Sequence, residues 1–342
     1  MLPMAATTVG LFPSTSPLYG IFSTWLLPAC LVWLLLGVDV RSLLGLGRPA
    51  VVLMTAGFAG VMGGAVAAAF FLRHWLPPES WKSLGALAAS WTGGSANMLA
   101  VKEALNVPDA VFAPVVMTDG LFAYSWMSLL IACVTGQERF DAWTGASTDW
   151  ERSLTAVPAT SGPPVAASTA LILGALGAVA AVLMSPHLPP FGGALTPAAW
   201  AVLLSTTGAL IVAGLLSRAG RGVSAGTEKA GNFLLLILVA SLGARVTLSA
   251  AARSPVFLAA GLIILLVHGA VLLAAARAGR FPLALAATTS QACIGGVVST
   301  PMVAAVYRPA LAVVGLLLAV AANAVGTYVG LLTAVMCRWV MK

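Results

Sequence analysis

Residues 309–336 read PALAVVGLLLAVAANAVGTYVGLLTAVM, and no Lys, Arg, Asp or Glu occurs between Pro309 and Cys337. A helix needs about 20 apolar residues to cross a bilayer, so this stretch is long enough to span a membrane. A second run without these residues extends from Ser153 to Ser217. Composition agrees, because 60% of the residues are hydrophobic and 8% are charged, whereas soluble domains contain roughly 25% charged residues. We therefore predict an integral membrane protein with almost no soluble part.

Ten hydrophobic segments are expected along the chain. In lipid, the polar groups of the backbone must be satisfied within each segment, so these segments are predicted to be α-helices. Their continuous apolar runs do not fit the alternating strands of a transmembrane barrel. The predicted class is an all-α integral membrane protein. The segments are 19–37, 50–72, 82–106, 110–135, 166–185, 197–216, 231–250, 255–277, 282–306 and 309–336.

The charged residues argue against nucleic acid and against an enzyme. The net charge is +7, but Lys and Arg occur singly between apolar runs, as in loops that flank membrane helices. Four cysteines lie far apart in apolar segments, without a CxxC pair or metal-ligand spacing, and are expected to be packing residues. No HExxH and no Walker sequence occurs. We expect no cofactor, no metal and no catalytic residue.

The two halves of the chain resemble each other, which suggests a duplication. A polar linker at 136–165 separates a first repeat, 18–135, from a second repeat, 166–342. Duplicated halves are typical of secondary transporters. The matching positions are Gly37 with Gly243, Val40 with Val246 and Pro49 with Pro255 at a constant shift of 206, and Gly93-Gly94 with Gly295-Gly296 at a shift of 202.

The number of segments bears on the orientation of the repeats. The counterpart of 19–37 is 231–250, the sixth segment after it, so the repeats would be parallel if every segment crossed the membrane once. Inverted repeats require an odd number of crossings. We therefore predict that 82–106 and 282–306 are broken or re-entrant near their Gly-Gly pairs, and that the halves are inverted.

These residues carry a family resemblance that extends from about residue 25 over nearly the whole chain. The motifs are SWTGGSAN at 90–97, Asp119 with AYSWM at 123–127, SQACIGG at 290–296 and AVGTYVGLL at 324–332. They resemble the YjcL-like family of uncharacterised membrane proteins, domain of unknown function 819. That family looks like a distant branch of the cation/proton antiporter and anion transporter group. The resemblance implies a transporter-like fold with inverted repeats, and no known substrate.

The sequence departs from the family pattern at its start. The resemblance implies two further hydrophobic segments before 19–37, as partners of 166–185 and 197–216, and the first repeat is expected to lack them. An uncovered groove is then predicted in the first half, where those two segments would pack.

Polar residues around the Gly-Gly pairs form the predicted binding site. Mid-membrane glycines let a helix break, and a broken helix offers N–H groups to anions and carbonyl groups to cations. The alternative is close helix packing by small residues. The predicted residues are Ser90, Thr92, Gly93, Gly94, Ser95 and Asn97 in the first half, and Ser290, Gln291, Gly295, Gly296, Ser299 and Thr300 in the second.

Asp119 is the residue most indicative of function, because a carboxylate near the centre of 110–135 is costly in lipid and usually faces a cavity or a partner. It is predicted to bind H⁺ or Na⁺ beside the Gly-Gly segments, in a polar cavity with Asn97, Ser299 or Thr300. The alternative is a structural role, either as a pair with Lys102 or as a satisfied hydrogen-bonded acid. Asn323 is expected to supply an amide in the second half, and Thr327 completes the predicted set.

Five other polar residues are expected to have structural roles. Lys102 and Glu103 are predicted to form a snorkelling pair at the membrane surface. Asp39 and Arg245, equivalent positions just past a helix end, are expected to anchor at the interface, and His268 to pack between helices.

The pattern favours a secondary active transporter of a small polar or anionic solute, coupled to H⁺ or Na⁺ and working by alternating access. The alternatives are an intramembrane enzyme acting on a lipid-linked substrate, and a channel or non-transporting scaffold. The expected partners are the lipid bilayer, a small solute and, in one possibility, a second copy of the chain. The expected location is the bacterial plasma (inner) membrane.

Overall fold

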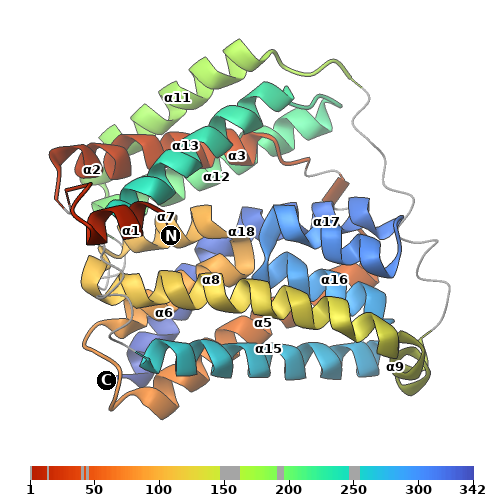
Figure 1. Cartoon of the computed structure of the whole chain (residues 1–342). Helices are drawn as coiled ribbons and strands as arrows, with labels where there is room; N and C mark the ends of the chain where they lie inside the picture. Colours follow the sequence, from red (N-terminus) through yellow and green to blue (C-terminus); the bar gives the residue numbers. More distant parts are fainter. Residues whose placement is uncertain are drawn as a thin grey trace.

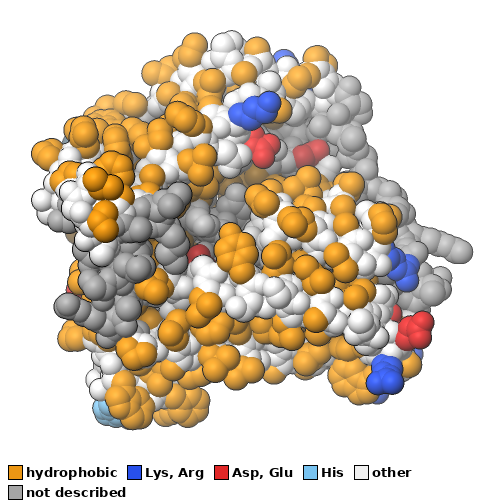
Figure 2. All heavy atoms as spheres, viewed as in Figure 1, with side chains coloured by type: hydrophobic (Ala, Val, Ile, Leu, Met, Phe, Trp, Pro, Cys, Tyr) orange, Lys and Arg blue, Asp and Glu red, His pale blue; other side chains and the backbone are white. Residues whose placement is uncertain are grey.

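The computed structural model describes residues 2–13, 15–39, 42–43, 46–146, 162–190, 196–245 and 255–342. Over these residues, eight helices are long and apolar enough to cross a membrane. The chain is an all-α integral membrane protein. Hydrophobic side chains are spread over the whole described part of the face shown in Figure 2, and charged side chains are few there. Such a surface is suited to lipid.

The helices follow the predicted segments closely. A π-helical turn, η1 (Phe22–Leu26), joins α2 and α3 into one continuous helix. The helices are α1 (Leu2–Thr8), α2 (Pro17–Ile21), α3 (Leu27–Leu36), α5 (Gly47–Leu72), α6 (Ser80–Gly93), α7 (Ser95–Ala104), α8 (Asp109–Ala132), α9 (Gln137–Thr144), α11 (Ala167–Met184), α12 (Pro197–Arg218), α13 (Ala225–Ala244), α15 (Val256–Gly279), α16 (Leu283–Ile294), α17 (Gly296–Tyr307) and α18 (Leu311–Val340).

The helices form two bundles, which Figure 1 shows one above the other. In the upper bundle, α3 packs against α11, α12 and α13. In the lower bundle, α5 packs along α15 and α6 along α18, with α8, α16 and α17 beside them. Helix α7 belongs to the lower bundle and contacts α12, α3 and α13 of the upper one. Each bundle therefore contains helices from both halves of the sequence.

Both Gly-Gly segments are interrupted, as predicted. Helix α6 ends at Gly93 and α7 begins at Ser95, so Gly94 lies between them with φ 81° and ψ 179°. This backbone conformation is essentially restricted to glycine. In the second segment, α16 ends at Ile294 and α17 begins at Gly296, whose φ is 74°. The second glycine of each pair thus carries the unusual conformation at the break.

Helices α5 and α15, which the predicted repeat makes equivalent, run antiparallel at very short separation. Gly60 lies against the backbone of His268, and Gly64, one turn later, lies against the backbone of Ile264, one turn earlier. A Cβ atom placed on Gly64 would be 2.7 Å from the Ile264 Cα atom. Glycines at this spacing allow two helix backbones to approach closely.

This packing makes a testable prediction about glycine. Gly60→Ala and Gly64→Ala are each expected to destabilise the protein by about 1–3 kcal/mol, because the new methyl group must push α15 away. Gly63→Ala is the matched control, since nothing lies within 4 Å of its Cβ position. Melting temperatures of the purified variants in one detergent would test this. Equal melting temperatures for all three variants would contradict the close approach.

Helices α3 and α13, the other predicted counterparts, are also antiparallel. The Cys30 thiol donates to the Gly231 carbonyl at 3.3 Å. Ser23, seven residues before Cys30, contacts Arg245, which comes 14 residues after Gly231. The contacts therefore advance in opposite directions along the two helices. Equivalent helices that run in opposite directions are what an inverted repeat requires. Superposition of the two halves stays a prediction, as do the repeat boundaries.

Three further predictions concern the polar linker, the uncovered groove and the two missing segments. The first part of the predicted linker is helical, as α9, and residues 147–161 lie outside the described residues, as do Val40 and Val246. Helix α13 exposes Phe233 and Leu236 at 63% and 69%. Lipid-facing helices also expose such side chains, so the uncovered groove and the two missing segments stay predictions.

Candidate functional site

A stripe of small residues places the first break against α18. Helices α6 and α18 run antiparallel, with Gly85 against Ala334 and Gly93 against Gly326. A Cβ atom on Gly93 would lie 2.7 Å from the Gly326 Cα atom. The break at Gly94 is therefore fixed next to the middle of α18, in the interior of the lower bundle.

Asp119, on α8, is held by the end of α6 just before the break. Its Oδ1 atom accepts hydrogen bonds from the Ser90 hydroxyl and from the Trp91 indole N–H, both at 2.9 Å. Trp91 is fully buried and Asp119 is half-buried. The predicted contact between Asp119 and the Gly-Gly segment is confirmed, whereas the predicted partner Lys102 binds other residues.

Asn97, in the first turn of α7, ties the other side of the break to α18. Its amide nitrogen donates to the Gly93 carbonyl at 2.6 Å, and to the backbone and side-chain oxygens of Asn323 at 3.0 and 2.6 Å. Its Oδ1 atom accepts a hydrogen bond from Thr327 at 2.5 Å. Asn97 thus satisfies a carbonyl that the helix end leaves without a partner. Asn323 lies in the second half of the chain, where it was expected to supply an amide, and its side chain contacts Asn97 at the first break.

The second break contains a different polar pair. The Gln291 amide, near the end of α16, donates to the Ser299 hydroxyl on α17 at 2.8 Å. The Gln291 Oε1 atom is buried and has no hydrogen-bond partner among the described residues. Gly315 of α18 lies against Thr288 and Thr300, so α18 passes both breaks.

A chain of hydrogen bonds centred on Ser290 joins four helices. The Trp126 indole N–H on α8 donates to the Ser290 hydroxyl oxygen at 2.9 Å, and Ser290 lies 3.0 Å from the His268 Nε2 atom. The other ring nitrogen, Nδ1, is 3.0 Å from the Gly57 carbonyl of α5. A carbonyl can only accept, so Nδ1 carries a proton, and with a neutral ring the Ser290 hydroxyl donates to Nε2. His268 is therefore a packed histidine between helices, as expected.

This chain predicts a large effect of a small substitution. Ser290→Ala is expected to destabilise the protein by about 1–3 kcal/mol, because it leaves the buried His268 Nε2 atom and the partly buried Trp126 N–H without a partner. Ser128→Ala is the control, since Ser128 is exposed on α8 and bonds only its own helix, at the Tyr124 carbonyl. Thermal unfolding in detergent would compare them. A Ser290 variant as stable as the Ser128 variant would show that the chain contributes little.

The predicted pair of Lys102 and Glu103 forms, but Lys102 does not snorkel to a surface. Lys102 is 3% exposed, and its Nζ atom lies 3.1 Å from Glu103 Oε1 and 3.0 Å from Asp109 Oδ1. It is therefore enclosed by protein, because the turn after α7 brings Asp109 back onto it. Arg245 lies 3.9 Å from Glu103, and its role as an interface anchor stays a prediction. Asp39 binds the backbone and hydroxyl of Ser42.

The remaining predicted residues play mostly local roles. Thr92 donates to the Ala88 carbonyl of α6, and Thr300 donates to the Gly296 carbonyl of α17, in each case four residues earlier. Ser95 is exposed, while Gly295 lies against the Gln291 and Ser299 side chains. The predicted cavity joining Asp119 to Asn97, Ser299 or Thr300 stays a prediction. Sequence reasoning missed Trp91 and Trp126.

These features define a class of protein: an all-α, multi-spanning membrane protein with two broken helices packed in one bundle. The chain belongs to the family described as "Protein of unknown function (DUF819)", whose model matches residues 1–340. It is 26% identical over 129 residues to the "Uncharacterized membrane protein YjcL" of Bacillus subtilis (strain 168). That match covers 38% of this chain and 32% of the Bacillus protein. No solved structure shows a significant match.

Proposed function

We propose that the protein is a secondary active transporter of a small polar or anionic solute, coupled to H⁺ or Na⁺. The observation that carries this proposal is the pair of helices broken at glycine, with the half-buried Asp119 bonded to the first one. Broken helices place backbone N–H and carbonyl ends inside a bundle, where they can bind ions and polar solutes. A helix with only a structural role would gain nothing from a break at glycine or from a half-buried carboxylate.

Asp119 is the proposed coupling residue. A carboxylate inside a membrane is usually retained for an ion or a proton pathway. Its Oδ1 atom has two donors, from Ser90 and Trp91, so binding a proton or Na⁺ would change the hydrogen bonds at the end of α6. Loading of the ion is thereby linked to the geometry of the break.

The division into two bundles supports alternating access. The bundles meet mainly through α7, and within the described parts of the chain few polar contacts cross between them. Two of these are the Thr196 hydroxyl with the Ala104 carbonyl at 2.7 Å, and Thr207 with Tyr328 at 2.8 Å. Such a boundary could open and close as one bundle moves against the other, which is the motion that carriers use.

One observation bears on the enzyme alternative. Ser290 and His268 lie at the distance of a nucleophile and its base. Both side chains are buried, however, and the Ser290 hydroxyl oxygen already accepts a hydrogen bond from the Trp126 indole N–H. Ser224, in the GVSAG sequence that fits a GxSxG pattern, instead accepts from the Gly226 backbone at the start of α13. We therefore prefer the carrier, in the bacterial plasma membrane, with a homodimer still a prediction.

Reconstitution into proteoliposomes tests the proposal. We expect solute uptake that depends on an imposed H⁺ or Na⁺ gradient and saturates with solute concentration. A current that does not saturate would favour a channel, and release of a product without uptake would favour an enzyme. Covalent labelling of Ser290 by a fluorophosphonate would also support the enzyme and overturn the carrier.

A further inference from the structure

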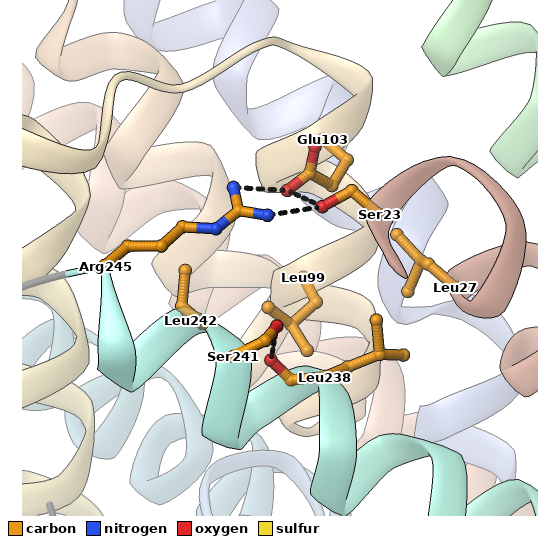
Figure 3. Close-up of a pocket in the computed structure, with 8 residues that line it drawn as sticks. All are labelled: Ser23, Leu27, Leu99, Glu103, Leu238, Ser241, Leu242 and Arg245. Carbon is orange, nitrogen blue, oxygen red and sulfur yellow. Dashed lines mark hydrogen bonds and ion pairs between the residues drawn. The ribbon is translucent and has the colours of Figure 1, made fainter. Parts of the chain in front are cut away.

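A small pocket lies where the two bundles meet, and it has both charged and apolar walls (Figure 3). Four leucines form the apolar wall, namely Leu27 from α3, Leu99 from α7, and Leu238 and Leu242 from α13. Glu103 comes from α7 in the lower bundle, whereas Ser23 and Arg245 come from η1 and the end of α13 in the upper one. The pocket is therefore shared between parts that would move apart during alternating access.

Arg245 has hydrogen-bond donors that the described protein does not use. Its Nη2 atom donates to the Tyr19 carbonyl at 2.6 Å and to the Ser23 hydroxyl at 3.0 Å. Its Nε atom is buried without a partner among the described residues, and its Nη1 atom has only a 3.9 Å contact with Glu103. Figure 3 shows the guanidinium pointing toward Glu103 and Ser23. A guanidinium with spare donors is well suited to a carboxylate.

Charge balance limits what the pocket can accept. Lys102 is held by Glu103 and Asp109, and Arg245 faces Glu103, so two positive and two negative side chains balance. A ligand with net charge would leave one charge unpaired in a poorly hydrated site, which is costly. A ligand that carries one charge of each sign would preserve the balance.

We propose that this pocket binds a small zwitterion with an aliphatic side chain, of the α-amino acid type. The carboxylate would bind Arg245, the ammonium group would bind Glu103, and the side chain would lie among the four leucines. The closed pocket, about 10 Å³, is near the minimum for one water molecule. The ligand must therefore enter a state in which the bundles, and with them Arg245 and Glu103, have separated. This inference rests on the proposed transport function and specifies its solute.

Ligand binding to the wild-type chain gives the first test. The full-length protein in detergent would be titrated with L-leucine, L-valine and L-methionine, and its melting temperature measured. Two half-ligands serve as controls: 4-methylpentanoate lacks the ammonium group of leucine, and isopentylamine lacks its carboxylate. We expect at least one amino acid to raise the melting temperature and neither half-ligand to do so. The proposal is overturned if no amino acid acts, or if a half-ligand acts as strongly.

Variants give the second test. Arg245→Gln and Glu103→Gln are each expected to weaken binding at least about tenfold, which corresponds to the loss of 1.4 kcal/mol. Arg139→Gln, which removes a charge from an exposed position on α9, should bind like the wild type. Unchanged binding in Arg245→Gln would overturn the proposal; should that variant not fold, the half-ligand comparison still decides.

The same assays separate this inference from the transport function, because binding needs no gradient. Amino acid binding without any uptake would preserve the site and refute the carrier. Gradient-driven uptake of another solute that is unchanged in Arg245→Gln would preserve the carrier and refute the site.

Discussion

Replacing Asp119 with Asn is expected to abolish gradient-driven solute uptake while leaving the folded protein in the membrane. Asn keeps the size of the side chain and an oxygen that can accept from Ser90 or Trp91, but it cannot take up a proton or bind a cation by charge. The substitution also removes an insertion cost of about 2.5–3.5 kcal/mol for a carboxylate at mid-helix. Stability should therefore not fall, and any loss of uptake reports on function.

Two further variants sharpen this test. Glu138→Gln removes a carboxylate from an exposed position on α9 and should transport normally. Ser90→Ala removes one of the two donors to Asp119 and should alter the H⁺ or Na⁺ dependence of uptake rather than stop it. Uptake would be measured in proteoliposomes at matched protein content. An Asn variant with the uptake rate and ion dependence of the wild type would exclude Asp119 as the coupling residue.

The helical, membrane-spanning character could be predicted because it depends on local properties alone. A charge-free run such as 309–336 is long enough to span lipid, whatever the rest of the chain does. The breaks could also be predicted, because paired glycines allow a conformation that other residues avoid. Gly94 and Gly296 adopt it, and each break occurs at its Gly-Gly pair.

The contacts between helices could be predicted only in part. Asp119 was expected beside the Gly-Gly segments, since few other groups could satisfy a carboxylate there, but which of the two segments it contacts was not predicted. The donor Trp91 was missed, because an aromatic residue in an apolar run also suits lipid or core packing. The meeting of Trp126 with Ser290 depends on the rotation of α8 and α16 about their axes, which no local pattern determines.

Lys102 shows a second reason why contacts could not be predicted from the sequence. A lysine eight residues past the break at Gly94 was expected to extend along its stem to the membrane surface. The structure instead turns the chain at the end of α7, so that Asp109 returns to Lys102 and Phe112 lies beneath the ammonium group, 5.6 Å from its ring centre. Arg245 joins the same group from 143 positions away in the sequence (245 − 102), a contact that only tertiary packing creates.

This burial leads to the second large expected effect. Lys102→Met keeps the length of the side chain but leaves Glu103 and Asp109 without their shared cation. Removing one partner of a buried ion pair costs about 3–5 kcal/mol, and because both carboxylates are partly exposed, at 23% and 37%, we expect a loss near the lower end of this range. The melting temperature in detergent, and the amount of folded protein recovered from membranes, should both fall clearly.

Lys82 provides the matched control for Lys102. It also pairs with a carboxylate, Glu79, at 2.9 Å, but the Glu79 side chain is 51% exposed. Pairs that water can reach contribute about 0–1 kcal/mol, so Lys82→Met should change stability little. The difference between the two methionine variants therefore measures the effect of enclosing the charges. If both variants melted at the wild-type temperature, the Lys102 cluster would be hydrated in the membrane, and the charge balance that selects a zwitterion in the neighbouring pocket would lose its basis.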